Sequence, residues 1–174
     1  MKTKLTLFVA VVAVALFVGG CASVPKPDVP HAVKWNGHWY AFWNDSVTST
    51  NAIRISEEQG GHLICIESKE ENQFVAELVH KQSGTKELVI KMGLRNHKGG
   101  NTNSQGIGGG EWKWINGKSA AKFYTNWYLA VAPPHDPKAP WGGMFVRSAD
   151  GQITAQYWSA ESEHRPRPFV IEWE

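Results

Sequence analysis

Helical periodicity is confined to the first half of the chain, and short strand-like runs separated by Gly-, Asn- and Pro-rich loops fill the second half. Residues 48–59 predict a first helix that stops at Gly60. Ser68 and Glu71 have the spacing of a capping box, which predicts the start of a second helix. Two early helices followed by a strand-rich half are typical of one fold class, α+β, which we therefore predict.

Five runs in the second half have the spacing of β-strands: LVIKMGL, EWKWI, GMFVR, TAQYW and PFVIEW. Earlier in the chain, Asn36-Gly37 predicts a hairpin turn, and HLICI, which is apolar on both faces, predicts a buried strand. Trp112 and Trp114 point to one face of their strand. We therefore expect both indoles in the core, with Lys113 facing out.

The first twenty residues have the organisation of an export signal. A cationic start at Met1–Lys4 precedes an apolar run at 5–18, which is short of the ~20 residues needed to span a bilayer. Small residues follow, and then Cys21. VGGC resembles the lipobox of bacterial lipoproteins, in which the cysteine becomes the lipidated first residue of the mature chain. The alternative is an ordinary signal peptide in which the cysteine falls there by chance.

This interpretation divides the chain into a signal peptide at 1–20, a lipidated cysteine and Pro-rich tether at 21–34, and one folded domain at 35–174. The resemblance implies that the membrane is a partner through lipidated Cys21 and that the protein lies in a bacterial cell envelope. Ala22 and Ser23 lack the aspartate that retains some lipoproteins in the inner membrane. The expected location is therefore the outer membrane, if the cell has one.

Charge and cysteine content limit the partners and the crosslinks that the mature domain can have. Removal of Lys2 and Lys4 with the signal peptide leaves 16 basic and 16 acidic residues, a balance that argues against nucleic acid as a partner. With Cys21 lipidated, Cys65 is the one remaining thiol, so no disulfide can form within the mature domain. Nine tryptophans, seven phenylalanines and four tyrosines supply ample bulk for a core instead.

An ordered series of motifs runs through residues 35–174. It comprises Ala52-x3-Ser56, GGHL at 60–63, IES-x-EEN at 66–72, Met92-Gly93-Leu94, GEWKWING at 110–117, TNW and the closing FVIEWE. The series resembles the C-type lectin-like domain. The resemblance implies two flanking helices, a lower antiparallel sheet that pairs the N- and C-terminal strands, and an upper sheet under a long loop region.

The chain departs from this family at its disulfides. Family members typically have a cysteine where this chain has Ser56 and another where it has Ile171, and the cysteines of a second disulfide are also missing. A crosslink that closes a loop of this size contributes up to ~4–5 kcal/mol. We expect the aromatic core to offset that loss.

A second departure concerns calcium. Sugar-binding members place a carboxylate-Pro-amide trio after the TNW-like tryptophan, where this chain has Ala132-Pro133-Pro134, and their Trp-Asn-Asp cluster aligns with Trp158-Ser159-Ala160. Calcium takes about six to eight oxygens, so we predict no metal and no cofactor. The alternative is a calcium lectin that recruits Asp136, Asp150 and Glu161 from separate loops.

The Pro-rich loop nonetheless has features of a binding surface. Prolines lower the entropy cost of holding one shape, and tryptophan and arginine are common interface anchors. The candidate ligand-binding residues are therefore His135, Asp136, Trp141 and Arg147. The alternative is that Trp141 belongs to the core and the other three are merely solvated.

Catalysis is not expected. Cys65 lies in an apolar strand, where a thiol is inert, and no serine-elbow, paired-carboxylate or HExxH signal is present. His62 is expected to form a structural hydrogen bond. We therefore predict a lipid-anchored, calcium-independent binding module for a glycan or a protein. The alternative is a purely structural envelope lipoprotein.

Overall fold

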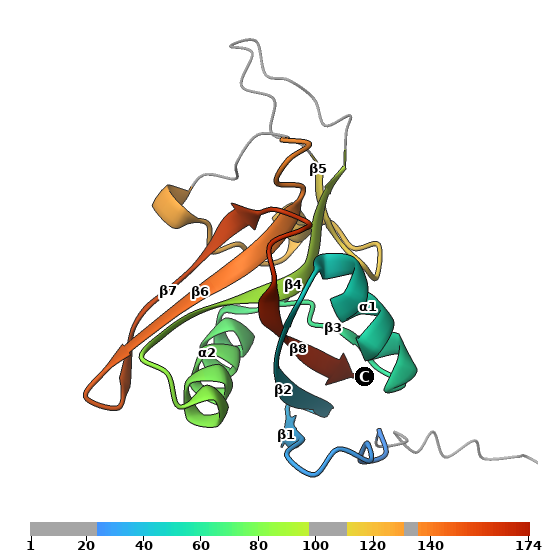
Figure 1. Cartoon of the computed structure of the whole chain (residues 1–174), viewed down its shortest axis with the longest axis vertical. Coiled ribbons are helices and arrows are strands. Elements are labelled where there is room, and N and C mark those ends of the chain that lie inside the picture. Colours follow the sequence, from blue (N-terminus) through green and yellow to red (C-terminus); the bar gives the residue numbers. More distant parts are fainter. Residues whose placement is uncertain (1–23, 98–110, 131–135) are drawn as a thin grey trace, which may run out of the picture.

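The computed structural model describes residues 24–97, 111–130 and 136–174 (Figure 1). The predicted signal peptide, the lipidation site Cys21 and the candidate ligand residue His135 lie outside these residues. Within the described ranges, no helix has the length and hydrophobicity required to cross a membrane.

The elements follow the predicted order of two helices and then mainly strands, which confirms the α+β class. They are β1 (Val33–Trp35), β2 (His38–Val47), α1 (Ser49–Glu58), β3 (His62–Leu63), α2 (Lys69–Ser83), β4 (Glu87–His97), β5 (Glu111–Trp114), η1 (Ala120–Lys122), η2 (Tyr128–Ala130), β6 (Trp141–Ala149), β7 (Gln152–Glu161) and β8 (Arg167–Trp173).

The strands form one curled sheet in the order β1-β2-β8-β4-β6-β7, with β3 on β8 and β5 on β4 (Figure 1). β2 and β8 pair antiparallel, with Ala41 opposite Ile171, so the predicted pairing of the N- and C-terminal strands is confirmed. The two expected sheets are joined into one mixed sheet because β4 and β8 meet in parallel at Lys91 and Phe169.

Local sequence signals explain both helices. Thr48 caps α1 through its side chain, and Gly60 follows the helix with φ +73°, a conformation that favours glycine. The Ser68 hydroxyl accepts a hydrogen bond from the Glu71 N–H at 3.0 Å and caps α2. In a full capping box the Glu71 carboxylate would accept from the N–H of Ser68. Here it accepts instead from the N–H of Glu67, one residue before the cap, at 2.7 Å.

Tryptophan rings fill the core between the sheet and the start of α2. Trp112 and Trp114 are both buried, as predicted. Trp112 packs on Trp127 with ring centroids 4.6 Å apart, and Trp114 meets Trp158 edge to face at 5.5 Å. These contacts hold β5 and the TNW segment against β7.

The positions of the missing family disulfide are bridged by apolar packing. Ser56 is buried, and its hydroxyl donates to the Ala52 carbonyl at 2.8 Å within α1. Ile171 is buried in one apolar cluster with Ala52 and Leu63. The contact between α1 and β8 is therefore hydrophobic, and Cys65 is a free, buried thiol.

The segment before β1 lies against the domain. Val29 is buried in the cluster that contains Ile171, and the Val24 carbonyl accepts a hydrogen bond from the Trp39 indole at 3.1 Å. Ordered structure therefore begins upstream of residue 35, because apolar residues among the prolines pack on the outer side of β2.

Candidate functional site

Two of the four candidate ligand residues lie on the same face of β6. Trp141 and Arg147 are six residues apart, so both point away from the α2 side of the sheet at opposite ends of the strand. Asp136 is exposed, and its carboxylate accepts a hydrogen bond from the Lys138 N–H at 2.8 Å within its own turn. Trp141 and Arg147 therefore do not belong to one compact cluster.

Trp141 is held tightly by its neighbours. The indole is buried, and the Arg95 guanidinium carbon lies 5.3 Å from the ring centroid. Burial alone would raise the pKa of the Glu163 carboxyl, but hydrogen bonds from Thr50 and Trp141 hold that pKa below its usual value. The indole is thus a packed residue, and its role in ligand binding stays a prediction.

Arg147 is exposed and begins a row of rings on the outer face of β6 and β7. Its guanidinium carbon lies 5.2 Å from the centroid of Phe145, and its Nε donates to Glu87 at 2.9 Å. Phe145 stacks on Tyr157, its direct partner on β7, with centroids 4.7 Å apart. The Tyr157 ring in turn lies 4.7 Å from the ring of Tyr128.

We call this surface the aromatic strip and define it as Arg147, Phe145, Tyr157, Tyr128 and Leu129. Its outer end is unusually exposed for apolar groups, since Tyr128 is 58% and Leu129 78% accessible. The strip joins β6 to the first residues of the LAVAPPHD loop. It therefore connects the predicted binding loop with Arg147 through residues that sequence reasoning did not select.

Leu129 has a strained backbone. Its φ and ψ are 60° and 18°, and Ala130 follows with φ 56°. The left-handed region costs a residue with a Cβ about 1–2 kcal/mol. The Leu129 side chain is 78% exposed, so packing against the described residues offsets little of this cost. Strain of this kind concentrates at functional sites.

The sequence gives only weak evidence for the ring residues of the aromatic strip. GMFVR and TAQYW were both predicted as strands, so Phe145 and Tyr157 could have been placed on a sheet face. Their pairing depends on the β6–β7 register, which a shift at Arg147–Ser148 sets. That register is not readable from spacing alone.

The described residues that align with the family's second calcium cluster offer few oxygen ligands. Ser159 and Ala160 lie in β7, paired with the glycines of β6, and offer one side-chain oxygen between them. Asp150 occupies a turn with φ 50°, and buried Glu161 lies 3.6 Å from the Arg167 Nε. In the part of the chain that the structure describes, no three His, Cys, Asp or Glu side chains are arranged to hold a metal.

A separate acidic cluster lies where α2 begins, against β2 and β8, and contains Glu67, Glu71, Glu172 and Glu174. Protein groups already engage its oxygens. Tyr40 donates its hydroxyl to Glu71 at 2.9 Å, and the Lys118 ammonium lies 2.7 Å from Glu67. Glu172 lies 2.8 Å from the His38 Nδ1. The cluster therefore ties elements together through its own donors.

Cys65 and His62 lie beside this cluster. His62 forms a hydrogen bond to Glu174 at 2.9 Å, in agreement with a structural role. Burial, followed by the Glu172 charge, raises the pKa of the Cys65 thiol, so a nucleophilic thiolate is disfavoured.

Comparisons with known proteins point to one fold. The gamma chain of the snaclec rhodocetin, from Calloselasma rhodostoma, is 32% identical over 112 residues, which cover 63% of this chain and 76% of that protein. The alpha chain of the snaclec stejaggregin-A, from Trimeresurus stejnegeri, is 33% identical over 98 residues, or 53% of this chain. The match spans only 56% of that stejaggregin-A chain and 57% of a further snaclec, salmorin from Gloydius brevicauda.

Solved structures agree. Human lithostathine superposes with a TM-score of 0.63 at 21% identity, covering 89% of this chain and 99% of that one. The carbohydrate-recognition domain of the mouse scavenger receptor C-type lectin gives 0.62 at 23% identity, with coverages of 84% and 97%. No family model matches the chain.

Proposed function

The chain belongs to the C-type lectin-like domain family, and from that premise we propose that it is a calcium-independent binding module held on a bacterial envelope by lipid on Cys21. Its relatives are binding or other non-enzymatic proteins of this fold, and the chain is likewise a non-enzymatic, lectin-like module. The proposal concerns its ligand surface, its independence of calcium and its anchor.

The observation that carries the proposal is the exposed, strained Leu129 at the end of the aromatic strip. An apolar side chain that is 78% exposed contributes little to the stability of its own fold. A ligand that covered Leu129 and Tyr128 would bury that surface and offset the strain. Tyrosine and arginine, the polar members of the strip, are the residues enriched at interface anchors.

The strip suits either ligand class that the sequence predicts. Ring faces stack on sugars, and a row of rings ending in Arg147 also suits a protein surface. Calcium independence is supported by Ser159 and Ala160, which offer one side-chain oxygen between them and no carboxylate. The bacterial anchor rests on the VGGC sequence.

The test is a broad glycan and protein-ligand screen of the purified chain in buffer that contains EDTA. We expect at least one class of ligand to bind. Arg147→Ala and Tyr157→Ala should weaken that binding by about tenfold or more, the effect of losing an interface anchor. Arg147 is a cleaner choice than buried Trp141, because its surface ion pair with Glu87 contributes little to stability.

Leu129→Gly separates binding from folding. Glycine adopts a positive φ without a Cβ clash, so the stability of this variant should be unchanged or raised by up to about 1 kcal/mol. Ligand binding should nevertheless fall. Ala130→Gly is the matched control, because it relieves similar strain without removing a large side chain. Ligand binding that survives every strip variant would show that the aromatic strip is not the binding surface. A screen in which no ligand binds would favour a structural envelope protein.

A further inference from the structure

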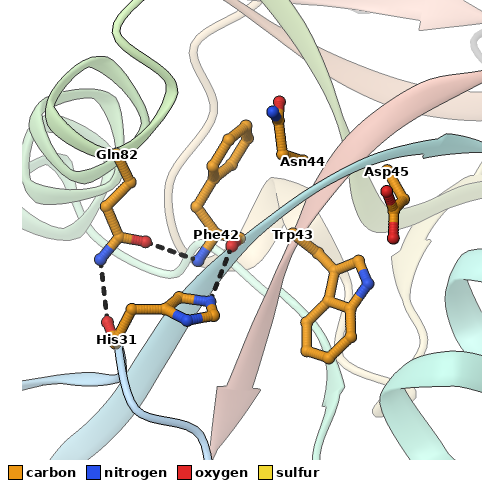
Figure 2. A pocket seen from close by; sticks show the side chains of 6 residues that line it. All are labelled: His31, Phe42, Trp43, Asn44, Asp45 and Gln82. Atoms are coloured by element: carbon orange, nitrogen blue, oxygen red, sulfur yellow. Dashed lines mark hydrogen bonds between the residues drawn. The ribbon is translucent and has the colours of Figure 1, made fainter.

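We propose that a groove on β2 is a binding site for a neutral pyranose sugar, separate from the aromatic strip. The groove has a volume of about 420 Å³ and is lined by His31, Phe42, Trp43, Asn44, Asp45 and Gln82 (Figure 2). β8, β4 and β6 separate β2 from β7 in the sheet. This site therefore adds a second location, with a defined kind of sugar, to the proposed function and does not depend on the strip.

The groove has a rigid frame. Gln82, near the end of α2, accepts a hydrogen bond from the Phe42 N–H at 3.1 Å and donates to the His31 carbonyl at 2.9 Å. The His31 Nε2 donates to the Phe42 carbonyl at 3.1 Å. Figure 2 shows these three bonds joining β2, α2 and the segment before β1. Preorganisation of this kind lowers the entropy cost of binding.

Trp43 supplies an aromatic wall. Its indole is half-buried and packs on Phe169 with ring centroids 6.1 Å apart, while the His31 ring lies 6.3 Å away. These contacts fix the plane of the indole and leave part of it facing the groove. An aromatic face of this kind stacks on the C–H face of a pyranose ring, which is apolar.

Two polar side chains without protein partners follow the indole along β2. The β2–β8 register shifts between Trp43 and Val47, and the intervening Asn44 and Asp45 are exposed on this irregular stretch. Neither the Asn44 amide nor the Asp45 carboxylate has a hydrogen bond or ion pair to any residue that the structure describes. Figure 2 shows Asp45 on the same side of β2 as Trp43, and Asn44 on the other side with Phe42.

The bonding of His31 also fixes its tautomer. Because the Phe42 carbonyl can only accept, the His31 Nε2 must carry the proton. In the neutral ring, Nδ1 is then an acceptor, and no described residue donates to it. On the Trp43 side of β2 the groove thus offers two acceptors, the Asp45 carboxylate and the His31 Nδ1, beside an aromatic face, and the Asn44 amide lines it from the other side of the strand (Figure 2). Sugar hydroxyls, which donate and accept on neighbouring carbons, complement this set.

The same contacts exclude other occupants. A peptide adding to the edge of β2 would need the N–H and C=O of Phe42, and Gln82 and His31 already occupy both. No lysine or arginine lines the groove, and Asp45 would repel an acidic sugar. A neutral, gluco-configured residue, whose equatorial hydroxyls leave a flat C–H face, fits best.

The test is isothermal titration calorimetry of the purified full chain with cellotriose and with triacetylchitotriose, and with a β-linked glucuronide as the anionic comparison. We expect a neutral oligosaccharide to bind and the glucuronide to bind at least tenfold more weakly. Asp45→Ala and Trp43→Ala should each weaken neutral-sugar binding at least tenfold. Because Trp43 also packs on Phe169, exposed Asp45 keeps the test valid if the tryptophan variant unfolds.

Phe123→Ala is the matched aromatic control, since Phe123 is 52% exposed and does not line the groove. Glu58→Gln is the matched acidic control on the exposed side of α1. Both should bind like the unchanged chain. Failure of both neutral sugars to bind at millimolar concentration, equal binding by Asp45→Ala, or preference for the glucuronide would each overturn the site. Arg147→Ala and Tyr157→Ala, the strip variants, should leave this sugar binding unchanged, which separates the groove from the aromatic strip.

Discussion

At the scale of single residues, two buried indoles in mutual contact differ in one hydrogen bond. The Trp158 Nε1 donates to the Asn72 Oδ1 at 2.7 Å, whereas the Trp114 Nε1 has no partner among the described residues. Both side chains are almost completely inaccessible. The period-2 spacing of EWKW was enough to predict that Trp114 is buried. Its lack of a partner could not be predicted, because that depends on which groups α2 and β7 bring nearby.

This difference predicts unequal costs for the same substitution. Trp158→Phe and Trp114→Phe remove similar ring volume, but only the former leaves a buried acceptor, on Asn72, without its donor. Trp158→Phe should therefore cost about 1–3 kcal/mol more in the free energy of unfolding, measured by urea denaturation. Equal losses would mean that the Asn72 bond contributes nothing to stability.

At the scale of elements, the acidic cluster joins the start of α2 to β2 and β8. The Glu71 carboxyl accepts from Tyr40, whose hydroxyl is also 3.3 Å from Glu172. Burial raises the pKa of Glu71 to about 7, opposed by the hydrogen bond from the Glu67 N–H and assisted by the Glu172 charge. The capping motif predicted where α2 begins. The surroundings of the Glu71 carboxylate could not be predicted from the motif. They depend on β2, more than thirty residues earlier in the chain, and on β8, about a hundred residues later.

The raised pKa makes stability depend on pH in a defined direction. Folded Glu71 holds its proton more tightly than the unfolded chain, so its contribution is complete below about pH 4.5 and is lost as the pH rises through 7. We expect a loss of about 2.5 kcal/mol from this group between pH 5 and pH 8.

Urea denaturation across this range, with Glu71→Gln as the test variant, measures the effect. Glutamine mimics the protonated acid, so this variant should lose most of the pH dependence and be the more stable protein at pH 8. Glu70→Gln, the exposed neighbour, should keep the original profile. A Glu71→Gln variant that is less stable by a constant amount at every pH would show that Glu71 is charged in the folded protein.

At the scale of the whole molecule, the order of motifs from Ala52 to the closing strand predicted the family, both helices and the pairing of the terminal strands. The ligand surface was less predictable. Arg147 and the LAVAPPHD loop are separate features of the sequence, and only the fold shows that Phe145, Tyr157 and Tyr128 connect them. Such a surface is assembled across strands, so no local spacing reveals it.

The proposed lipid anchor is also tested on the whole chain. Lipoprotein processing would attach more than one acyl chain at Cys21, and two or more chains hold a protein firmly on a membrane. In a bacterial host, the unchanged chain should fractionate with membranes, and Cys21→Ala should be released or remain unprocessed. Cys65→Ala is the matched control and should stay anchored. A cleaved Cys21→Ala protein that still fractionates with membranes would rule out the lipid anchor.

The central claim is that this chain retains a lectin-like scaffold and binds without calcium, and calorimetric titration of the purified protein with calcium tests it most directly. Too few oxygen ligands remain at the family positions, and the carboxylates of the acidic cluster already have protein donors. We therefore predict no binding heat at millimolar calcium. Calcium uptake with micromolar affinity, which at a hundredfold excess would stabilise the fold by about 2.7 kcal/mol, would contradict the claim.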